Sequence, residues 1–427
     1  MVITTYFRRS IALLAIVALL AGCSANPVTG KRELSLISER QERAIGAEQY
    51  IPTQQTQGGQ FYLDPDLTVY VRDVGHKLAA VSDRPDLPYE FVVLNSSVPN
   101  AWALPSGKIA INRGLLVLLE DEAQLASVLG HEIVHAAARH SAQRMQSGML
   151  LSAGMAGLGV ALGDNEMAGL VMGGAALGGQ LALAQHSQSD ELESDHYGIK
   201  YMVKAGYNPQ AAVELQQLFL QLSEGRSGDF LGSLFATHPP SQKRVNENAR
   251  LARQLGAEGF RGKEVYQQKI AYLKRVTPAY EAYDEARKLA QKDKLDAALG
   301  KVNEAINAVP DEAMFYALRG QIHSAMKAPG KAGRDYDKAV ALYPEMFSYR
   351  LHRGLHELAQ NNLAKAEKDL SQANRTVPTS IAYLRLGDIA VKQRNKNQAI
   401  AYYNQAAQAE GPVAQEARRK LAALTSG

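Results

Sequence analysis

A regular spacing of small residues and prolines runs through about the last 150 residues of this 427-residue chain. Pro310, Pro344 and Pro378 lie 34 residues apart. Three columns of small residues keep the same period: Ala298, Ala332 and Ala366; Ala305, Ala339 and Ala373; Ala286, Gly320 and Gly354. Small residues where two helices cross, with a proline that closes each copy, predict helix pairs that stack on one another. Because each pair buries its apolar face only against its neighbours, we expect an α-solenoid in this part of the chain.

The period and its composition resemble the tetratricopeptide repeat. A further copy runs one residue early, and its matching residues are Gly387, Ala399, Tyr403 and Ala406. About four repeats are therefore expected over residues 277–427, after a linker at residues 263–276. Repeats of this type bind peptides or partner proteins on the concave face of the solenoid, so the resemblance implies a protein-binding role.

The N-terminus has the features of a secretory signal. Arg8 and Arg9 precede an apolar run, Ile11–Leu20, that is shorter than the about 20 residues needed to span a bilayer. The sequence Leu-Ala-Gly-Cys that ends at Cys23 resembles the lipobox of bacterial lipoproteins, which are cut before a cysteine that is then acylated. Ser24 resembles the residue found in lipoproteins sorted to the outer membrane. We therefore expect residues 1–22 to be a lipoprotein signal peptide; the alternative is a simple secretory signal.

The composition of the chain argues against nucleic-acid binding and excludes a disulfide bond within the chain. Charged residues make up 21% of the chain and the formal net charge is only +4. This is not the strongly positive charge that proteins use to bind the phosphates of nucleic acid. Cys23 is the only cysteine, so no disulfide can form within the chain.

Residues 148–184 are apolar and rich in glycine, alanine and methionine. Gly163–Glu166 breaks them into two pieces, each shorter than a membrane span. We expect either two core helices that pack closely through small residues, or a pair that rests on lipid or covers a cleft.

The stretch SVLGHEIVHAAARHS, residues 127–141, places polar side chains in an apolar run typical of a buried helix. His131 and His135 are spaced i, i+4, so both imidazoles project from one helix face and can reach one ion. Glu132 lies at the flank of that face, where it can contact a metal-bound water. This is the HExxH pattern of zinc proteases. A buried glutamate would be costly here without a metal or a water to meet it.

Catalytic zinc usually has three protein ligands and a water, so a third ligand is needed downstream. The segment QSDELESDHYG offers four carboxylates: Asp190, Glu191, Glu193 and Asp195. Spacing alone does not choose among them. His140 lies off the face shared by His131 and His135, and we expect it to have a structural or supporting part.

HEIVH followed by ELESD resembles the HExxH…ExxxD signature of the HtpX/BepA-like zinc endopeptidases, which are gluzincins. NAWALPSGKIAINRGLL and THPPSQKRV resemble two further segments of this family, and the lipobox and repeats make the chain most similar to its BepA-like periplasmic members. The resemblance implies that Glu191 is the third ligand, that Asp195 orients a metal-bound histidine, and that His238 lies near the metal. The serine-arginine pair usual before ExxxD is Ser187-Gln188 here, which leaves the support of the Glu191 loop open.

In the implied mechanism, one Zn²⁺ per chain activates a water and Glu132 accepts its proton. His238 or Tyr197 donates a hydrogen bond to the oxyanion. In BepA-like proteins the histidine that matches His238 can also be a fourth ligand that keeps the enzyme latent, and we carry this over as a hypothesis. Gly107–Asn112 is expected to form an edge strand that pairs with the backbone of a substrate.

The predicted fold is mainly α (α+β), with a zincin-like metalloprotease domain over residues 23–262 and the α-solenoid after it. Short β-rich runs at Tyr89–Leu94 and Lys108–Asn112 supply a small β-sheet. The predicted function is that of a periplasmic zinc metalloendopeptidase, lipid-anchored to the outer membrane, which cuts unfolded or misassembled proteins. Its repeats are expected to dock to the β-barrel assembly machinery. The alternative is a latent or non-catalytic lipid-anchored chaperone or scaffold that acts through the repeats.

Overall fold

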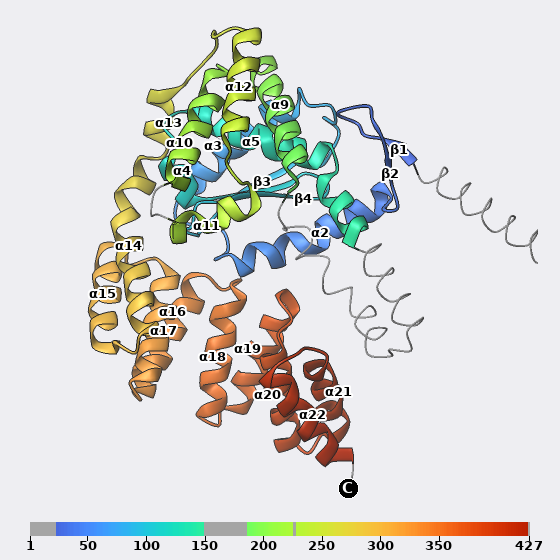
Figure 1. The fold of residues 1–427 in the computed structure, drawn as a ribbon. Coiled ribbons are helices and arrows are strands. Elements are labelled where there is room, and N and C mark those ends of the chain that lie inside the picture. Colours follow the sequence, from blue (N-terminus) through green and yellow to red (C-terminus); the bar gives the residue numbers. More distant parts are fainter. Residues whose placement is uncertain (1–22, 149–185, 225–227, 426–427) are drawn as a thin grey trace, which may run out of the picture. The chain divides into compact units, whose positions relative to one another are not determined.

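The computed structural model describes residues 23–148, 186–224 and 228–425 of the chain (Figure 1). The predicted signal peptide and residues 149–184 of the predicted apolar segment lie outside these ranges. Within them, no helix is both long enough and apolar enough to cross a membrane.

The described chain forms two compact units. The first contains the residues up to Thr53 together with Asp64–Ala271. The second contains Gln54–Leu63 and the residues from Tyr272 onward. Each unit has its own buried core, and each is described separately below.

The first unit is mostly helical and contains two small sheets. Its strands are β1 (Cys23–Ala25), β2 (Arg32–Leu34), β3 (Glu90–Leu94), β4 (Ala101–Leu104) and β5 (Lys108–Asn112). The helices that lie in it or begin in it are α2 (Glu39–Thr56), α3 (Pro65–Ala79), α4 (Arg113–Leu118), α5 (Glu122–Ala137), α9 (Gln188–Lys204), α10 (Gln210–Glu224), α11 (Gly228–Thr237), α12 (Gln242–Leu255) and α13 (Lys263–Lys269). Residues 140–148 are also helical.

The larger sheet has the strand order β3-β5-β4. β5 runs parallel to β3, with Ile109 opposite Phe91, and antiparallel to β4, with Ala110 opposite Trp102. The smaller sheet is an antiparallel pair of β1 and β2, in which the backbone of Cys23 is opposite Leu34.

β5 is therefore the central strand, and the prediction that Gly107–Asn112 forms the edge strand is wrong. The physical reason is a tight turn before β5. Ser106 and Gly107 have φ values of 67° and 77°, and two consecutive residues with positive φ form the hairpin turn that folds β4 back along β5. β4 (Ala101–Leu104), which was not predicted as a strand, is the edge on this side of the sheet.

Both faces of the sheet are buried, which explains why its strands are apolar almost throughout. On one face Trp102 packs edge-on against Tyr50 of α2, with the ring centroids 6.4 Å apart. On the other face Phe91 lies on Gly75 of α3, where a Cβ atom would come within 2.5 Å of the ring. α5 packs against α3 and β4, so the sheet and α3 together hold the helix that contains HEIVH.

The second unit is a solenoid of antiparallel helix pairs, yellow to red in Figure 1. Its helices are α14 (Ala271–Gln291), α15 (Leu295–Ala308), α16 (Ala313–Ala325), α17 (Pro329–Leu342), α18 (Phe347–Ala359), α19 (Leu363–Thr376), α20 (Ser380–Lys392), α21 (Lys396–Ala407) and α22 (Pro412–Thr425). Residues 263–276, expected as a linker, are occupied by α13 and the start of α14.

The small residues of the 34-residue period lie where the helices meet. Ala298, Ala332 and Ala366 are fully buried. A Cβ atom at Gly320 would come within 2.7 Å of the Tyr336 ring, so a larger residue would separate α16 from α17. The predicted fold class, mainly α with a small sheet and a repeat solenoid after it, is confirmed.

The end of α2 and the connection from α2 to α3 contribute a segment to the second unit. Gln54–Leu63 belongs to that unit, and Phe61 is 1% exposed there. The Phe61 ring meets Tyr280 edge-on at 6.2 Å, and the Tyr62 hydroxyl donates to the carbonyl of Asp311 at 2.7 Å. The solenoid therefore includes residues that come long before the repeats in the sequence.

Candidate metal centre

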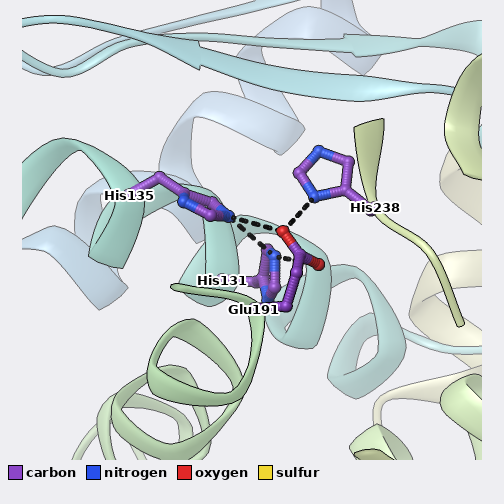
Figure 2. Close-up of side chains that lie close together, drawn as sticks. All are labelled: His131, His135, Glu191 and His238. Carbon is purple, nitrogen blue, oxygen red and sulfur yellow. Dashed lines mark hydrogen bonds and ion pairs between the residues drawn. The ribbon is translucent and has the colours of Figure 1, made fainter. Parts of the chain in front are cut away.

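The HEIVH sequence lies in α5, which begins with a side-chain cap. The Asp121 carboxylate accepts a hydrogen bond from the Gln124 backbone N–H at 2.8 Å, which satisfies one of the free donors at the start of the helix. His131 and His135 follow one turn apart, and their Nε2 atoms lie 3.0 Å from each other (Figure 2). The i, i+4 spacing thus directs both imidazoles to one point.

α9 brings a carboxylate to this pair of histidines. The Ser187 hydroxyl accepts from the Asp190 N–H at 3.1 Å, and the Asp190 carboxylate accepts from the Ser187 N–H at 3.2 Å, which is a capping box. Glu191 follows in the first turn. Its two carboxylate oxygens lie 3.4 Å from His135 Nε2 and 3.5 Å from His131 Nε2. This capping box stabilises the first turn of α9, where Gln188 stands in place of the arginine usual in the HtpX/BepA-like family.

Two glycines let α5 and α9 approach closely. A Cβ atom on Gly198 would lie 3.0 Å from the backbone nitrogen of His131, and one on Gly130 would lie 3.1 Å from the carbonyl oxygen of Gly198. Neither position has free room for a methyl group. The glycine pair therefore sets the separation at which Glu191 reaches the histidines.

His238, directly after α11, completes a group of four possible ligands. Its Nδ1 atom lies 3.1 Å from Oε1 of Glu191. One donor atom from each of His131, His135, Glu191 and His238 lies within 4.8 Å of the others, and all four side chains are buried (Figure 2). Imidazole nitrogen and carboxylate oxygen are the ligands of catalytic zinc. The donor set therefore fits a divalent metal ion.

The protonation state of Glu191 suits a metal ligand. Burial raises the pKa of its carboxyl group, but the positive charges around it, those of His238 and His131 first, outweigh burial and hold the pKa well below its ordinary value. Glu191 is therefore ionised at neutral pH, and a ligating carboxylate must be ionised to bind a metal.

The two histidines of α5 differ in protonation when no metal is bound. Burial lowers the pKa of His131, but the charge of Glu191 and the hydrogen bond of Asp195 outweigh burial and raise the pKa to about 10. Burial and surrounding positive charge hold the pKa of His135 well below its ordinary value. A metal ion must therefore displace a proton from His131 but finds His135 already neutral.

Glu132 lies beside the donor set with one carboxylate oxygen unpaired. Its Oε1 atom is 3.5 Å from His238 Nε2, and among the described residues its buried Oε2 atom has no hydrogen-bond partner. Burial raises the pKa of Glu132 more than the charges of His238 and His131 lower it. A cavity of about 40 Å³, large enough for about one water, is lined by Glu132, His131, His238 and Ala101. This arrangement suits a base that takes a proton from a water.

Arg244 of α12, a residue without a predicted role, contacts two carboxylates of the site. Its Nε and Nη2 atoms donate to the two carboxylate oxygens of Asp195 at 2.7 Å each, and its Nη1 atom lies 2.7 Å from Glu191. Asp195 in turn lies 2.9 Å from Nδ1 of His131. One buried guanidinium thus balances two carboxylates and fixes the orientation of a histidine. The signal in the sequence was the arginine that ends THPPSQKR.

The structure brings together His131, Glu132, His135, Glu191 and His238, with Asp195 behind His131, and their roles stay predictions. Two other acidic candidates have different contacts: Asp190 caps α9, and Glu193 faces His140. Tyr197, one of the two predicted oxyanion donors, lines a separate groove between α9 and α12.

Comparison with known proteins gives a family match for residues 65–251. Residues 65–251 match the model of peptidase family M48, and this match contains HEIVH, ELESD and THPPSQKR. Residues 65–251 form an M48 peptidase domain. The four buried donors are the candidate metal centre of this M48 domain, and the family implies a bound metal. Residues 329–381 and 384–424 match the tetratricopeptide repeat, so the predicted combination of metalloprotease and repeats is confirmed.

The chain is similar in sequence to several named proteins. The chain is 30% identical to the β-barrel assembly-enhancing protease of Yersinia pestis, over 54% of this chain and 47% of that protein. It is 28% identical to the protein of the same name in Escherichia coli (strain K12), over 66% and 68%. It is 29% identical to the mitochondrial metalloendopeptidase OMA1 of Schizosaccharomyces pombe, over 52% and 64%. The matches to the Yersinia and Schizosaccharomyces proteins thus span less than two thirds of those proteins.

Replacing Arg244 with glutamine should lower the free energy of unfolding by about 3–5 kcal/mol, because Glu191 and Asp195 would lose their buried cation. Arg250→Gln is the matched control on the same helix. Arg250 is 53% exposed and pairs with exposed Glu247, so its loss should cost less than about 1 kcal/mol. Urea denaturation of metal-free protein measures both variants. Equal losses would contradict the assignment of Arg244 as the support of the two carboxylates.

The raised pKa of His131 predicts that zinc binding releases about one proton per chain at pH 7.5, and that affinity weakens about tenfold per unit as pH falls below about 10. The sign follows because the metal-free site holds a proton that the metal must displace. Calorimetric titration in two buffers of different ionisation enthalpy counts the protons. Asp195→Asn should release fewer protons, because it removes a carboxylate that holds the proton on His131. Zinc binding with no proton release would contradict this assignment.

Proposed function

We propose that the M48 domain is a zinc metalloendopeptidase that hydrolyses peptide bonds in unfolded or misassembled proteins. The observation that carries this proposal is the buried donor set of His131, His135 and Glu191, with one carboxylate oxygen of Glu132 beside it that has no hydrogen-bond partner among the described residues. A purely structural metal site has no need of such a base.

Each residue of the site has a separate role in the proposed hydrolysis. His131, His135 and Glu191 hold the zinc ion, which when bound polarises the scissile carbonyl and makes a nearby water more acidic. Glu132 takes the proton of that water as the water attacks the carbonyl, and later donates it to the leaving amine. Asp195 and Arg244 keep His131 in the orientation that this geometry needs.

We propose that His238 keeps this site closed. It lies 3.1 Å from Glu191 and 3.5 Å from Glu132, and it is 8% exposed. The cavity of about 40 Å³ beside it has room for a water but not for a peptide. In this proposal His238 moves when a substrate enters, and as a fourth ligand it holds the enzyme latent until then.

The edge strand β4 is the proposed binding site for the substrate backbone. The backbone N–H of Asn112 donates to the carbonyl of Asn100 at 2.8 Å, so by alternation Ala101 and Ala103 point their backbone groups away from β5. Ala103 accepts a hydrogen bond from the Ser141 hydroxyl, whereas Ala101 has no such partner among the described residues and lines the cavity. An extended chain added here would reach the metal centre and would be held mainly through its backbone.

The cellular role is proposed from the relatives and the N-terminus. Two relatives are named β-barrel assembly-enhancing protease, which supports a part in quality control and assembly of outer-membrane proteins. The Leu-Ala-Gly-Cys sequence supports a lipid anchor at Cys23 and a place at the periplasmic face of the outer membrane. The repeats would dock the substrate or the assembly machinery.

The test uses full-length mature chain with Cys23 replaced by serine, zinc, and unfolded casein as substrate. Glu132→Gln should bind zinc normally and cleave about 10²–10⁴ times more slowly, because it lacks the general base. His238→Ala should cleave faster than wild type, because the site is then open. His196→Ala is the matched control, since His196 lines the groove between α9 and α12 and not the cavity.

Two other results would change the assignment. If His238→Ala cleaves more slowly than wild type while Glu132→Gln is inactive, His238 is the oxyanion donor and not a latch. If wild type and His238→Ala both bind zinc and cleave nothing, the protease proposal fails, and the lipid-anchored scaffold takes its place.

A further inference from the structure

The two histidines of α5 are held differently on the side that faces away from the other donors. Nδ1 of His131 lies 2.9 Å from the carboxylate of Asp195. Nδ1 of His135 lies instead 2.8 Å from Nδ1 of His140, whose Nε2 is 3.3 Å from Oε1 of Glu193. We propose that His140 and Glu193 form a relay of hydrogen bonds that positions His135 for the metal. This inference rests on the proposed metalloprotease function.

Only one arrangement of protons along the relay suits a metal ligand. Nε2 of His135 faces His131 and Glu191 (Figure 2), so it must offer a lone pair and its proton must be on Nδ1. That N–H donates to Nδ1 of His140, which therefore has no proton. The proton of His140 is then on Nε2, from where it donates to the carboxylate of Glu193.

The burial of the pair makes the relay necessary. His135 is 0% exposed and His140 is 2% exposed, so an N–H group of His135 without an acceptor would be costly. The turn after α5 supplies the acceptor: Arg139 has a φ of 64°, and the helical segment of residues 140–148 begins at His140, beside His135. Glu193 lies two residues after Glu191 on α9, so one helix supplies both the third donor and the end of the relay.

The relay ends at the surface of the first unit. The side chain of Glu193 is 17% exposed and lines the groove between α9 and α12, together with Lys31, Lys243 and Glu247. Glu193 therefore accepts the hydrogen bond of a buried histidine from a position near solvent. The carboxylate that contacts His131 is that of Asp195, which is buried next to Arg244. The carboxylate linked to His135 is that of Glu193, which lies near solvent.

A second metal ion is the competing explanation of the same contacts. His135, His140 and His186 each offer a nitrogen within 4.8 Å of the others. Such an ion would require His135 to bind metal through both nitrogens. The guanidinium of Arg144 also contacts Nδ1 of His186, which places a positive charge at that histidine. The hydrogen-bonded relay needs neither condition.

The test measures zinc affinity by competition with a chelator, using the full mature chain with Cys23→Ser. His140→Phe should bind zinc about 10–100 times more weakly, and Glu193→Ala about 10 times more weakly, as for other residues that orient metal ligands. Glu193→Gln should lose less than Glu193→Ala, because its carbonyl oxygen still accepts the hydrogen bond. Glu247→Ala, in the same groove, should bind zinc as wild type does.

A second readout separates positioning from packing. Nitrogen NMR of the zinc-loaded protein should find the proton of His135 on Nδ1 and that of His140 on Nε2, which packing alone does not dictate. The melting temperature of the metal-free variants shows whether they fold. If His140→Phe does not fold, Glu193→Ala, at a partly exposed position, carries the affinity test.

Three results would overturn the relay. Unchanged zinc affinity in folded His140→Phe and in Glu193→Ala would overturn it and leave the metalloprotease proposal standing. Two zinc ions per wild-type chain, with one lost in His140→Phe, would overturn it in favour of the second ion. A wild-type chain that binds no zinc would overturn both the relay and the proposed function.

Discussion

The close contact between the backbones of α5 and α9 is the constraint on which the candidate centre depends. Gly130 and Gly198 allow it, since a Cβ atom at either position would lie about 3 Å from the backbone of the other helix. At this separation Glu191 lies within 3.5 Å of both histidines of HEIVH. The same approach places Asp195, one turn further along α9, behind His131. A single helix contact thus aligns a possible ligand and the group that orients another.

The second requirement is balance of charge in a buried place. Three carboxylates and three imidazoles share a space with almost no solvent, and ionised groups there are costly unless each is paired. Arg244 pairs with Asp195 and Glu191 at once. It lowers the pKa of Asp195, and it adds to the charges of His238 and His131 that lower the pKa of Glu191. Among the described residues, Glu132 has no such partner for its second oxygen, and burial raises its pKa. The carboxyl groups of Glu191 and Glu132 thus differ in pKa although they are close together. The pKa of Glu191 suits a metal ligand, and that of Glu132 suits a group that accepts a proton.

Local patterns in the sequence predicted the parts of this molecule that depend on local physics. The i, i+4 spacing of His131 and His135 and the 34-residue period depend only on helix geometry and on packing between neighbours, so both could be read directly. The choice of Glu191 among four nearby carboxylates needed a family resemblance, because spacing within α9 does not say which side chain faces α5.

Contacts between distant segments could not be predicted in this way. The order β3-β5-β4 depends on a tight turn at Ser106 and Gly107, and so the edge of the sheet was assigned to the wrong strand. Arg244 reaches Asp195 from a helix 49 residues further along the chain, and no local pattern reports such a pairing. The packing of Gln54–Leu63 in the solenoid unit was likewise not visible, because its partners are more than 200 residues away.

X-ray absorption at the zinc edge tests the central claim most directly, which is that one zinc ion is held by His131, His135, Glu191 and His238. The account predicts one zinc per chain with only nitrogen and oxygen ligands at about 2.0–2.2 Å, three of them imidazoles. In His238→Ala the imidazole count should fall to two, with an oxygen ligand in place of the third. The same count of imidazoles in wild type and His238→Ala, or a wild-type chain with fewer than two, would contradict the account.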